Sequence, residues 1–139
     1  MTIEITVDVP STEVPETDPV TVFVCTSCRN AEGSSIEPLP GQDLARATIA
    51  AGKAAGVPVR AVSCLGNCNR RLSAALMREG GWSYVFGDLR VEQAADLIAA
   101  AQLFATSPNG VLPWRGRPDS LKRGLVARIP PIDHLENFS

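Results

Sequence analysis

The sequence predicts an α/β (α+β) domain with a small mixed sheet: a strand–helix–strand unit, then a hairpin and a C-terminal helix. Two observations predict this order. In the first half, two compact runs of β-forming residues flank an alanine-rich segment, and in the second half a glycine pair separates two more such runs. Residues 91–105 then repeat apolar side chains at helical spacing, and the rest of the chain forms an extension rich in proline and arginine.

The strand–helix–strand unit begins with VTVFVC at residues 20–25, a short and strongly β-forming run. Residues 42–55 are good helix formers, and Gly56 follows them as a typical helix end. Residues 57–64 form the second strand, where Pro58 is tolerated because it stands near the strand's start.

The hairpin is expected from residues 72–79 and 82–88, which flank the glycine pair. The helix over residues 91–105 follows, and we expect Asp88 to help start it. The proline-rich remainder holds one short helix candidate, PDSLKR at residues 118–123, with proline early and glycine after its end.

Length and charge indicate a single globular domain with flanking segments. The chain has 139 residues and a net charge of −2, and a chain of this size can bury a core of its own. We expect an N-terminal arm or edge strand at 1–19, a domain at 20–106 and an extension at 107–139. Because no run of 18 apolar residues occurs and the acidic start is unlike a signal peptide, we expect a cytoplasmic protein with no membrane span.

All four cysteines stand in two pairs, Cys25 with Cys28 and Cys64 with Cys68. Each pair follows a predicted strand, and the 35 residues between the pairs hold a loop, a helix and a strand. A strand–helix–strand crossover makes the two strands parallel, so that both end at the same edge of the sheet. The topology therefore predicts one site that gathers four thiols, which suits zinc or an iron–sulfur cluster.

Three kinds of site compete for these thiols: a redox dithiol, structural zinc and a [2Fe-2S] cluster. A thioredoxin-type redox dithiol gains reactivity from a helix that follows it immediately, whereas a loop of at least 12 residues follows Cys28 here. Structural zinc accepts the spacing, although a domain with its own core does not need the metal in order to fold. A Rieske centre needs two histidines, and the single histidine, His134, stands near the far end of the chain, where we expect a surface residue.

The pattern C-x2-C-x35-C-x3-C over residues 20 to about 105 resembles the thioredoxin-like [2Fe-2S] ferredoxins, and CLGNC at residues 64–68 is its most specific part. It is also similar to the small [2Fe-2S] subunit of respiratory NADH dehydrogenase. The segment LPWRGRPDSLKRGLVARIPP resembles a bacterial family of predicted metal-binding proteins, domain of unknown function 1636, often associated with cobalamin biosynthesis. These resemblances imply a thioredoxin-like fold, a [2Fe-2S] cluster, a frequent homodimer and, more weakly, a cobalamin context.

The residues beside the cysteines suit an anionic cluster. Arg29, Arg70 and Arg71 can offset its charge, and Gly66 can take a positive φ that turns backbone N–H groups toward sulfur. Because four thiolates leave no open position for substrate, we expect a one-electron carrier that serves a reductase and an acceptor enzyme, and not an enzyme itself. The alternative is an accessory protein that binds zinc or senses a cluster and docks through its C-terminal extension.

Residues 111–128 hold five basic residues and one acid around Trp114. One aromatic residue and a pI of about 5.4 are poor evidence for a nucleic-acid surface, so we expect no nucleic-acid partner. Two interpretations remain: the segment folds back on the domain or on a dimer mate and buries Trp114, or it docks an acidic redox partner. We expect the first, with the bases meeting the acids of residues 1–40.

Overall fold

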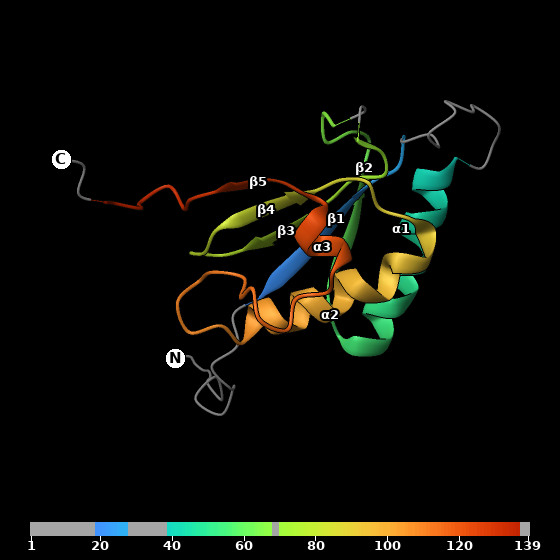
Figure 1. Cartoon of the computed structure of the whole chain (residues 1–139). Helices are drawn as coiled ribbons and strands as arrows, with labels where there is room; N and C mark the ends of the chain where they lie inside the picture. Colours follow the sequence, from blue (N-terminus) through green and yellow to red (C-terminus); the bar gives the residue numbers. More distant parts are fainter. Residues whose placement is uncertain (1–18, 28–38, 68–69, 137–139) are drawn as a thin grey trace, which may run out of the picture.

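A computed structural model describes residues 19–27, 39–67 and 70–136. It confirms the mixed α/β fold: a five-stranded sheet in the order β2-β1-β3-β4-β5, with helices packed against it (Figure 1). No helix in these ranges is both long enough and apolar enough to cross a bilayer. The strands are β1 (Val20–Cys25), β2 (Val59–Val62), β3 (Ala74–Arg78), β4 (Ser83–Phe86) and β5 (Leu125–Ile129).

The strand–helix–strand unit forms as predicted, with β1 and β2 parallel and α1 (Pro40–Ala55) between them in sequence. The Leu39 N–H donates to Oε1 of Gln42 at 2.9 Å, which satisfies one of the free donors at the start of the helix. Gly56 ends the helix in the left-handed conformation, at φ 76°. Strand β2 is shorter than expected because the Val57 N–H donates to the Gly52 carbonyl and so belongs to the turn after the helix.

The hairpin also forms as predicted, since β3 and β4 pair antiparallel around the glycine pair. The next helix begins as a 3-10 turn, η4 (Val91–Gln93), and continues as α2 (Ala94–Ala105). The expectation that Asp88 helps start this helix is wrong. Its carboxylate instead pairs with Arg70, and its own φ is 56°.

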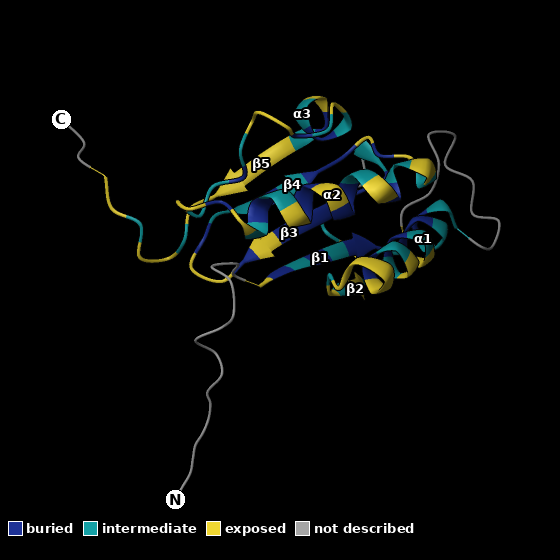
Figure 2. Cartoon of the chain, turned by 90° about the horizontal axis from the view of Figure 1, so that it is seen from below, coloured by how far each residue is buried: buried dark blue, intermediate teal, exposed yellow. Residues whose placement is uncertain are grey.

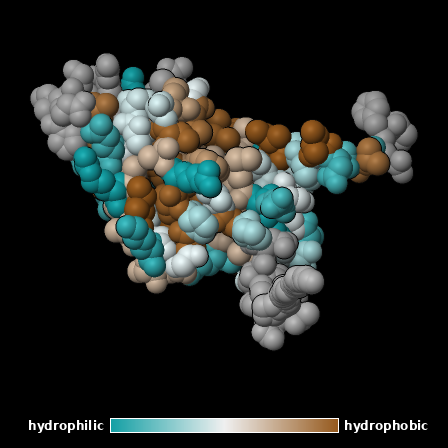
Figure 3. Space-filling model, turned by 180° about the vertical axis from the view of Figure 1, so that it is seen from behind, coloured by the Kyte–Doolittle hydropathy of each residue, from teal (hydrophilic) through white to brown (hydrophobic). Residues whose placement is uncertain are grey.

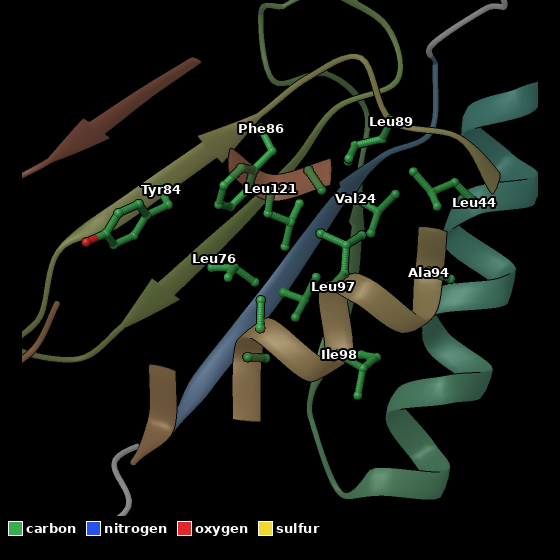
Figure 4. Packing of buried hydrophobic residues seen from close by; sticks show 14 of the residues in the cluster. Val24, Leu44, Leu76, Tyr84, Phe86, Leu89, Ala94, Leu97, Ile98 and Leu121 are labelled. Atoms are coloured by element: carbon green, nitrogen blue, oxygen red, sulfur yellow. The ribbon is translucent and has the colours of Figure 1, made fainter. Parts of the chain in front are cut away.

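The core lies between one face of the sheet and helices α1 and α2, which cover that face together (Figure 2). Alternate residues of β1 are buried in it, and Phe86 of β4 lies beside Leu121 of α3 (Ser120–Arg123) (Figure 4). The Tyr84 ring of β4 meets Phe104 of α2 edge-on, with centroids 5.4 Å apart. The fully buried large side chains include Tyr84, Phe86, Leu97 and Leu121.

Strand β5 was not expected from the sequence, and it extends the sheet on the far side of β4. The segment before it folds back on the domain through Leu112 and Leu121, which are 1% and 0% exposed. The expectation that Trp114 is buried there is wrong, because it stays 60% exposed. The partnership of these bases with the acids of residues 1–40 lies mostly outside the described residues.

Arg117 takes the buried place in this segment that we expected for Trp114. Its Nε and Nη2 atoms donate to the carbonyls of Pro113 and Leu112, at 3.1 and 2.8 Å. Its guanidinium also lies over the ring of Tyr84, 5.6 Å from the centroid. Burial lowers the pKa of Arg117 from its ordinary value, and these carbonyls stabilise the charge where water cannot.

Candidate functional site

The carboxyl ends of β1 and β2 bring Cys25 and Cys64 to one edge of the sheet. Cys25 is the last residue of β1 and lies opposite Val62, the last residue of β2, and Cys64 stands two residues further on. The Thr26 N–H and hydroxyl both donate to the Val62 carbonyl, at 2.8 and 3.0 Å, which ties the two strand ends together. The predicted convergence of the two cysteine segments is therefore observed for one cysteine of each pair.

The two described thiols have opposite environments. Cys25 is 1% exposed, and its Sγ lies 3.6 Å from both the Ser63 carbonyl and the Ser27 hydroxyl. Cys64 is exposed, and the Gly66 N–H donates to its Sγ at 3.1 Å. Gly66 has a φ of 74°, the conformation predicted to turn a backbone donor toward sulfur. Such a donor stabilises a thiolate and tunes a metal bound to it.

Cys28 and Cys68 lie outside the described residues, so the four-thiolate set stays a prediction. Within the described ranges, no three metal-ligating side chains converge. Two cysteine side chains at one edge, one of them with an N–H aimed at its sulfur, nevertheless match the donor chemistry that iron–sulfur clusters and zinc require.

A hydrogen-bond network that sequence reasoning missed holds the loop after Cys64. The Asn67 amide donates to the Arg70 carbonyl at 3.3 Å and to the Ser73 hydroxyl at 3.1 Å. The end of β4 presses on the same loop, because a Cβ added to Gly87 would lie 2.5 Å from Asn67 Nδ2 and 2.6 Å from the Arg70 carbonyl oxygen. The only sequence signal for this approach is a glycine directly after a strand.

Arg70 links this loop to the C-terminal segment. Its Nε donates to Asp88 at 2.8 Å, and its Nη1 and Nη2 donate to the carbonyls of Leu125 and Arg123, at 3.5 and 3.3 Å. All three nitrogens are thus directed at β5, α3 and Asp88, and the guanidinium supports the loop mechanically. Arg71 is half-buried, and Arg29 lies outside the described residues.

His134 lies against the hairpin, as a residue of the C-terminal segment. Its ring meets Trp82 edge-on with centroids 5.1 Å apart, and its Nε2 lies 2.6 Å from a Glu136 carboxylate oxygen. Both contacts are to residues of the hairpin and of the segment after β5.

An apolar hollow of about 510 Å³ lies at the other end of β1, next to the last turns of α1 and α2. Its walls are backbone and small apolar or uncharged side chains, among them Val20, Val57, Ala101 and Thr106. None of the residues that line it is titratable, so the hollow itself supplies no general acid or base.

Comparison with known proteins agrees with the fold. A family described as "Protein of unknown function (DUF1636)" matches residues 22–131. A thioredoxin-like [2Fe-2S] ferredoxin from Aquifex aeolicus superposes with a TM-score of 0.53 at 12% identity, over 85% of this chain and 99% of that one. A second structure of a ferredoxin with this description, from the same organism, gives a TM-score of 0.46 at 13% identity, over 79% and 98%. No curated protein matches the chain.

Proposed function

The chain belongs to the DUF1636 family, and we propose that it is a [2Fe-2S] protein that carries single electrons in the cytoplasm. The proposed ligands are Cys25, Cys28, Cys64 and Cys68. The observation that carries the proposal is the meeting of Cys25 and Cys64 at one edge of a parallel strand pair. The fold shared with a thioredoxin-like [2Fe-2S] ferredoxin supports it.

When bound, such a cluster accepts and returns one electron without making or breaking a bond in a substrate. The chain's own residues set the conditions for this exchange. Cys25 is buried, so its sulfur is shielded from water, whereas Cys64 is exposed and lies on the side where a partner can approach. The Gly66 N–H stabilises negative charge on the Cys64 sulfur, which favours the reduced, more anionic state.

In this role the chain transfers electrons and catalyses no reaction itself. Four protein thiolates fill the coordination positions of the cluster, and the apolar hollow beside β1 offers no acid or base. The partners would be a reductase and an acceptor enzyme, in a pathway that the family resemblance suggests is cobalamin biosynthesis.

We also propose that two copies associate. The sheet face opposite α1 and α2 presents Met77 and Ile129, which are 47% and 52% exposed, and an arm with fully exposed Ile132 and 91% exposed Leu135 follows β5. Figure 3 shows hydrophobic atoms along the upper margin of the domain and along the projecting arm. Exposed apolar strands of this kind are usually covered. Sedimentation equilibrium of the full chain tests this, and a monomer at all concentrations would rule the dimer out.

The test of the cofactor is anaerobic purification with iron, sulfide and zinc analysis and with EPR of the reduced protein. We expect a red-brown protein whose visible absorption bleaches with dithionite. A colourless protein with one equivalent of zinc would support the accessory alternative and overturn the electron carrier.

The test of the ligands is a set of single Cys→Ser variants at the four positions, with Ser63→Ala as the control beside Cys64. We expect each cysteine variant to lose the cluster or to hold it poorly, because serine is a much poorer ligand for iron. The control should keep its iron, since the contact of Ser63 with Cys25 uses its backbone carbonyl. A Cys28→Ser protein with full iron and an unchanged spectrum would remove Cys28 from the ligand set.

A further inference from the structure

A polar notch of about 260 Å³ opens between the start of η4 and the end of α3. Arg90 and Gln93 line it on one side, and Ser120, Arg123 and Gly124 line it on the other. Asp88 completes the wall, with its carboxylate taken by Arg70 at 2.8 Å. The notch is too small for a nucleotide or another large cofactor, which need roughly 300–1,000 Å³, and its size suits a single small polar group.

The guanidinium groups of Arg90 and Arg123 give the notch its charge. Both residues are exposed, and neither guanidinium has an ion-pair partner among the described residues. Arg70 adds a third positive charge, and Asp88 adds a negative one. Asp96, behind the wall, adds a second negative charge and accepts a hydrogen bond from the Ser120 hydroxyl at 2.8 Å. The sum of these five groups is +1, in a chain whose net charge is −2.

Five of the six wall residues already use their backbone N–H groups in hydrogen bonds: Asp88, Arg90, Gln93, Arg123 and Gly124. The charged donors at the notch are the guanidinium groups of Arg90 and Arg123. Phosphate sites usually recruit free backbone N–H groups at helix starts or turns. Two unpaired guanidinium forks instead match the planar geometry of a carboxylate.

The notch adjoins the proposed cluster loop. The Arg70 carbonyl accepts hydrogen bonds from the Asp88 N–H, at 2.9 Å, and from the Asn67 amide, at 3.3 Å. One wall residue is therefore a single hydrogen-bonded step from the segment that carries Cys64 and Cys68. A group that enters the notch would hold its parent molecule beside the cluster.

Basic side chains continue from the notch along α3 and the segment that precedes it. Lys122 and Arg117 both lie over the ring of Trp114, each 5.1 Å from its centroid, and Arg115 is exposed beside it. An exposed tryptophan flanked by cations is typical of protein-binding surfaces, where Trp and Arg supply much of the affinity. The surface beyond the notch is thus extended and basic, which suits a macromolecule better than a free ion.

We propose that the notch between Arg90 and Arg123 binds a carboxylate side chain of an acidic protein partner, which docks beside the cysteine loop. The role of this partner in electron transfer rests on the proposed function, whereas the carboxylate site does not. Charge complementarity at such a surface mainly raises the association rate and the specificity.

The experiment measures fluorescence anisotropy of a labelled hexaglutamate peptide with the full chain, with a hexaglutamine peptide as the neutral probe. The test variant is Arg90→Gln with Arg123→Gln. The matched control is Arg46→Gln with Lys53→Gln, which removes the same charge from α1. We expect saturable binding of hexaglutamate alone at low salt, weakened about tenfold or more by the test variant and unchanged by the control. Added salt should weaken the binding of hexaglutamate further, because exposed charges farther apart than the Debye length, about 10 Å at 0.1 M salt, are largely screened from each other.

Equal loss of hexaglutamate binding in the test and control variants would refute the notch as the binding site, because binding would then depend on net charge alone. Binding of inorganic phosphate without hexaglutamate would overturn the docking role and leave a small-anion site. Iron and sulfide analysis of the same samples separates the two proposals. Absence of the cluster with intact peptide binding refutes the electron carrier, and a full cluster without peptide binding refutes the notch.

Discussion

The end of β4 lies close to the cysteine loop at Gly87, and replacing this glycine with alanine is the sharpest test of the site's construction. The new Cβ would lie 2.5 Å from Asn67 Nδ2, 2.6 Å from the Arg70 carbonyl oxygen and 2.9 Å from Arg70 Cβ. Ordinary contact begins near 3.4 Å, so the end of β4 and the loop must separate by almost 1 Å. Overpacking of this kind costs about 1–3 kcal/mol.

The same separation lengthens the hydrogen bond from the Asp88 N–H to the Arg70 carbonyl, now 2.9 Å, at a further cost of about 1 kcal/mol. The free energy of unfolding should therefore fall by roughly 2–4 kcal/mol, which lowers the melting temperature by roughly 10 °C in a domain of this size. The strain falls on the segment between Cys64 and Cys68, so we also expect the cluster to be lost faster to a chelator.

The assay is thermal unfolding followed by circular dichroism, together with the rate of iron loss to a chelator. Gly80→Ala in the hairpin turn is the matched control. Its φ is 74° with open space around the Cβ, so it costs stability only through backbone strain, about 1–2 kcal/mol, and should leave the rate of iron loss unchanged. A Gly87→Ala protein with an unaltered melting temperature and rate of iron loss would refute the reasoning, because the loop would then yield without cost.

Three further predictions concern the C-terminal segment, and urea denaturation measures all of them. Tyr84→Phe removes the acceptor, at 2.9 Å, of the buried Leu112 N–H and should cost about 1–3 kcal/mol; an unchanged midpoint would mean that this donor finds another partner. Leu121→Ala empties a fully buried site and should cost about 2–5 kcal/mol. Truncation after Gly110 removes the buried Leu112 and Leu121 together with β5, so an equally stable truncated protein would contradict the role that we assign to the segment.

The sequence alone predicts the strand–helix–strand unit and the edge where the cysteines meet, because these features depend on local residue preferences. Strand β1 is specified by its run of β-forming residues, and α1 by a run of helix-forming residues that ends at Gly56. The strand–helix–strand crossover then makes β2 parallel to β1. From that topology follows the meeting of Cys25 and Cys64 at one edge, which is the basis of the proposed site. The conformation of Gly66 is equally local, since glycine accepts a positive φ at little cost.

The tertiary structure alone decided the features that depend on contacts between distant segments. Strand β5 pairs with β4, from which 38 residues separate it in the sequence, so no local sequence pattern predicts the pairing. The sequence likewise favoured burial of Trp114, whereas Arg117 is buried there because two backbone carbonyls and the Tyr84 ring stabilise its charge. The links from Arg70 to Asp88 and α3 arise in the same way. They depend on where folded segments meet in space, which residue preferences do not encode.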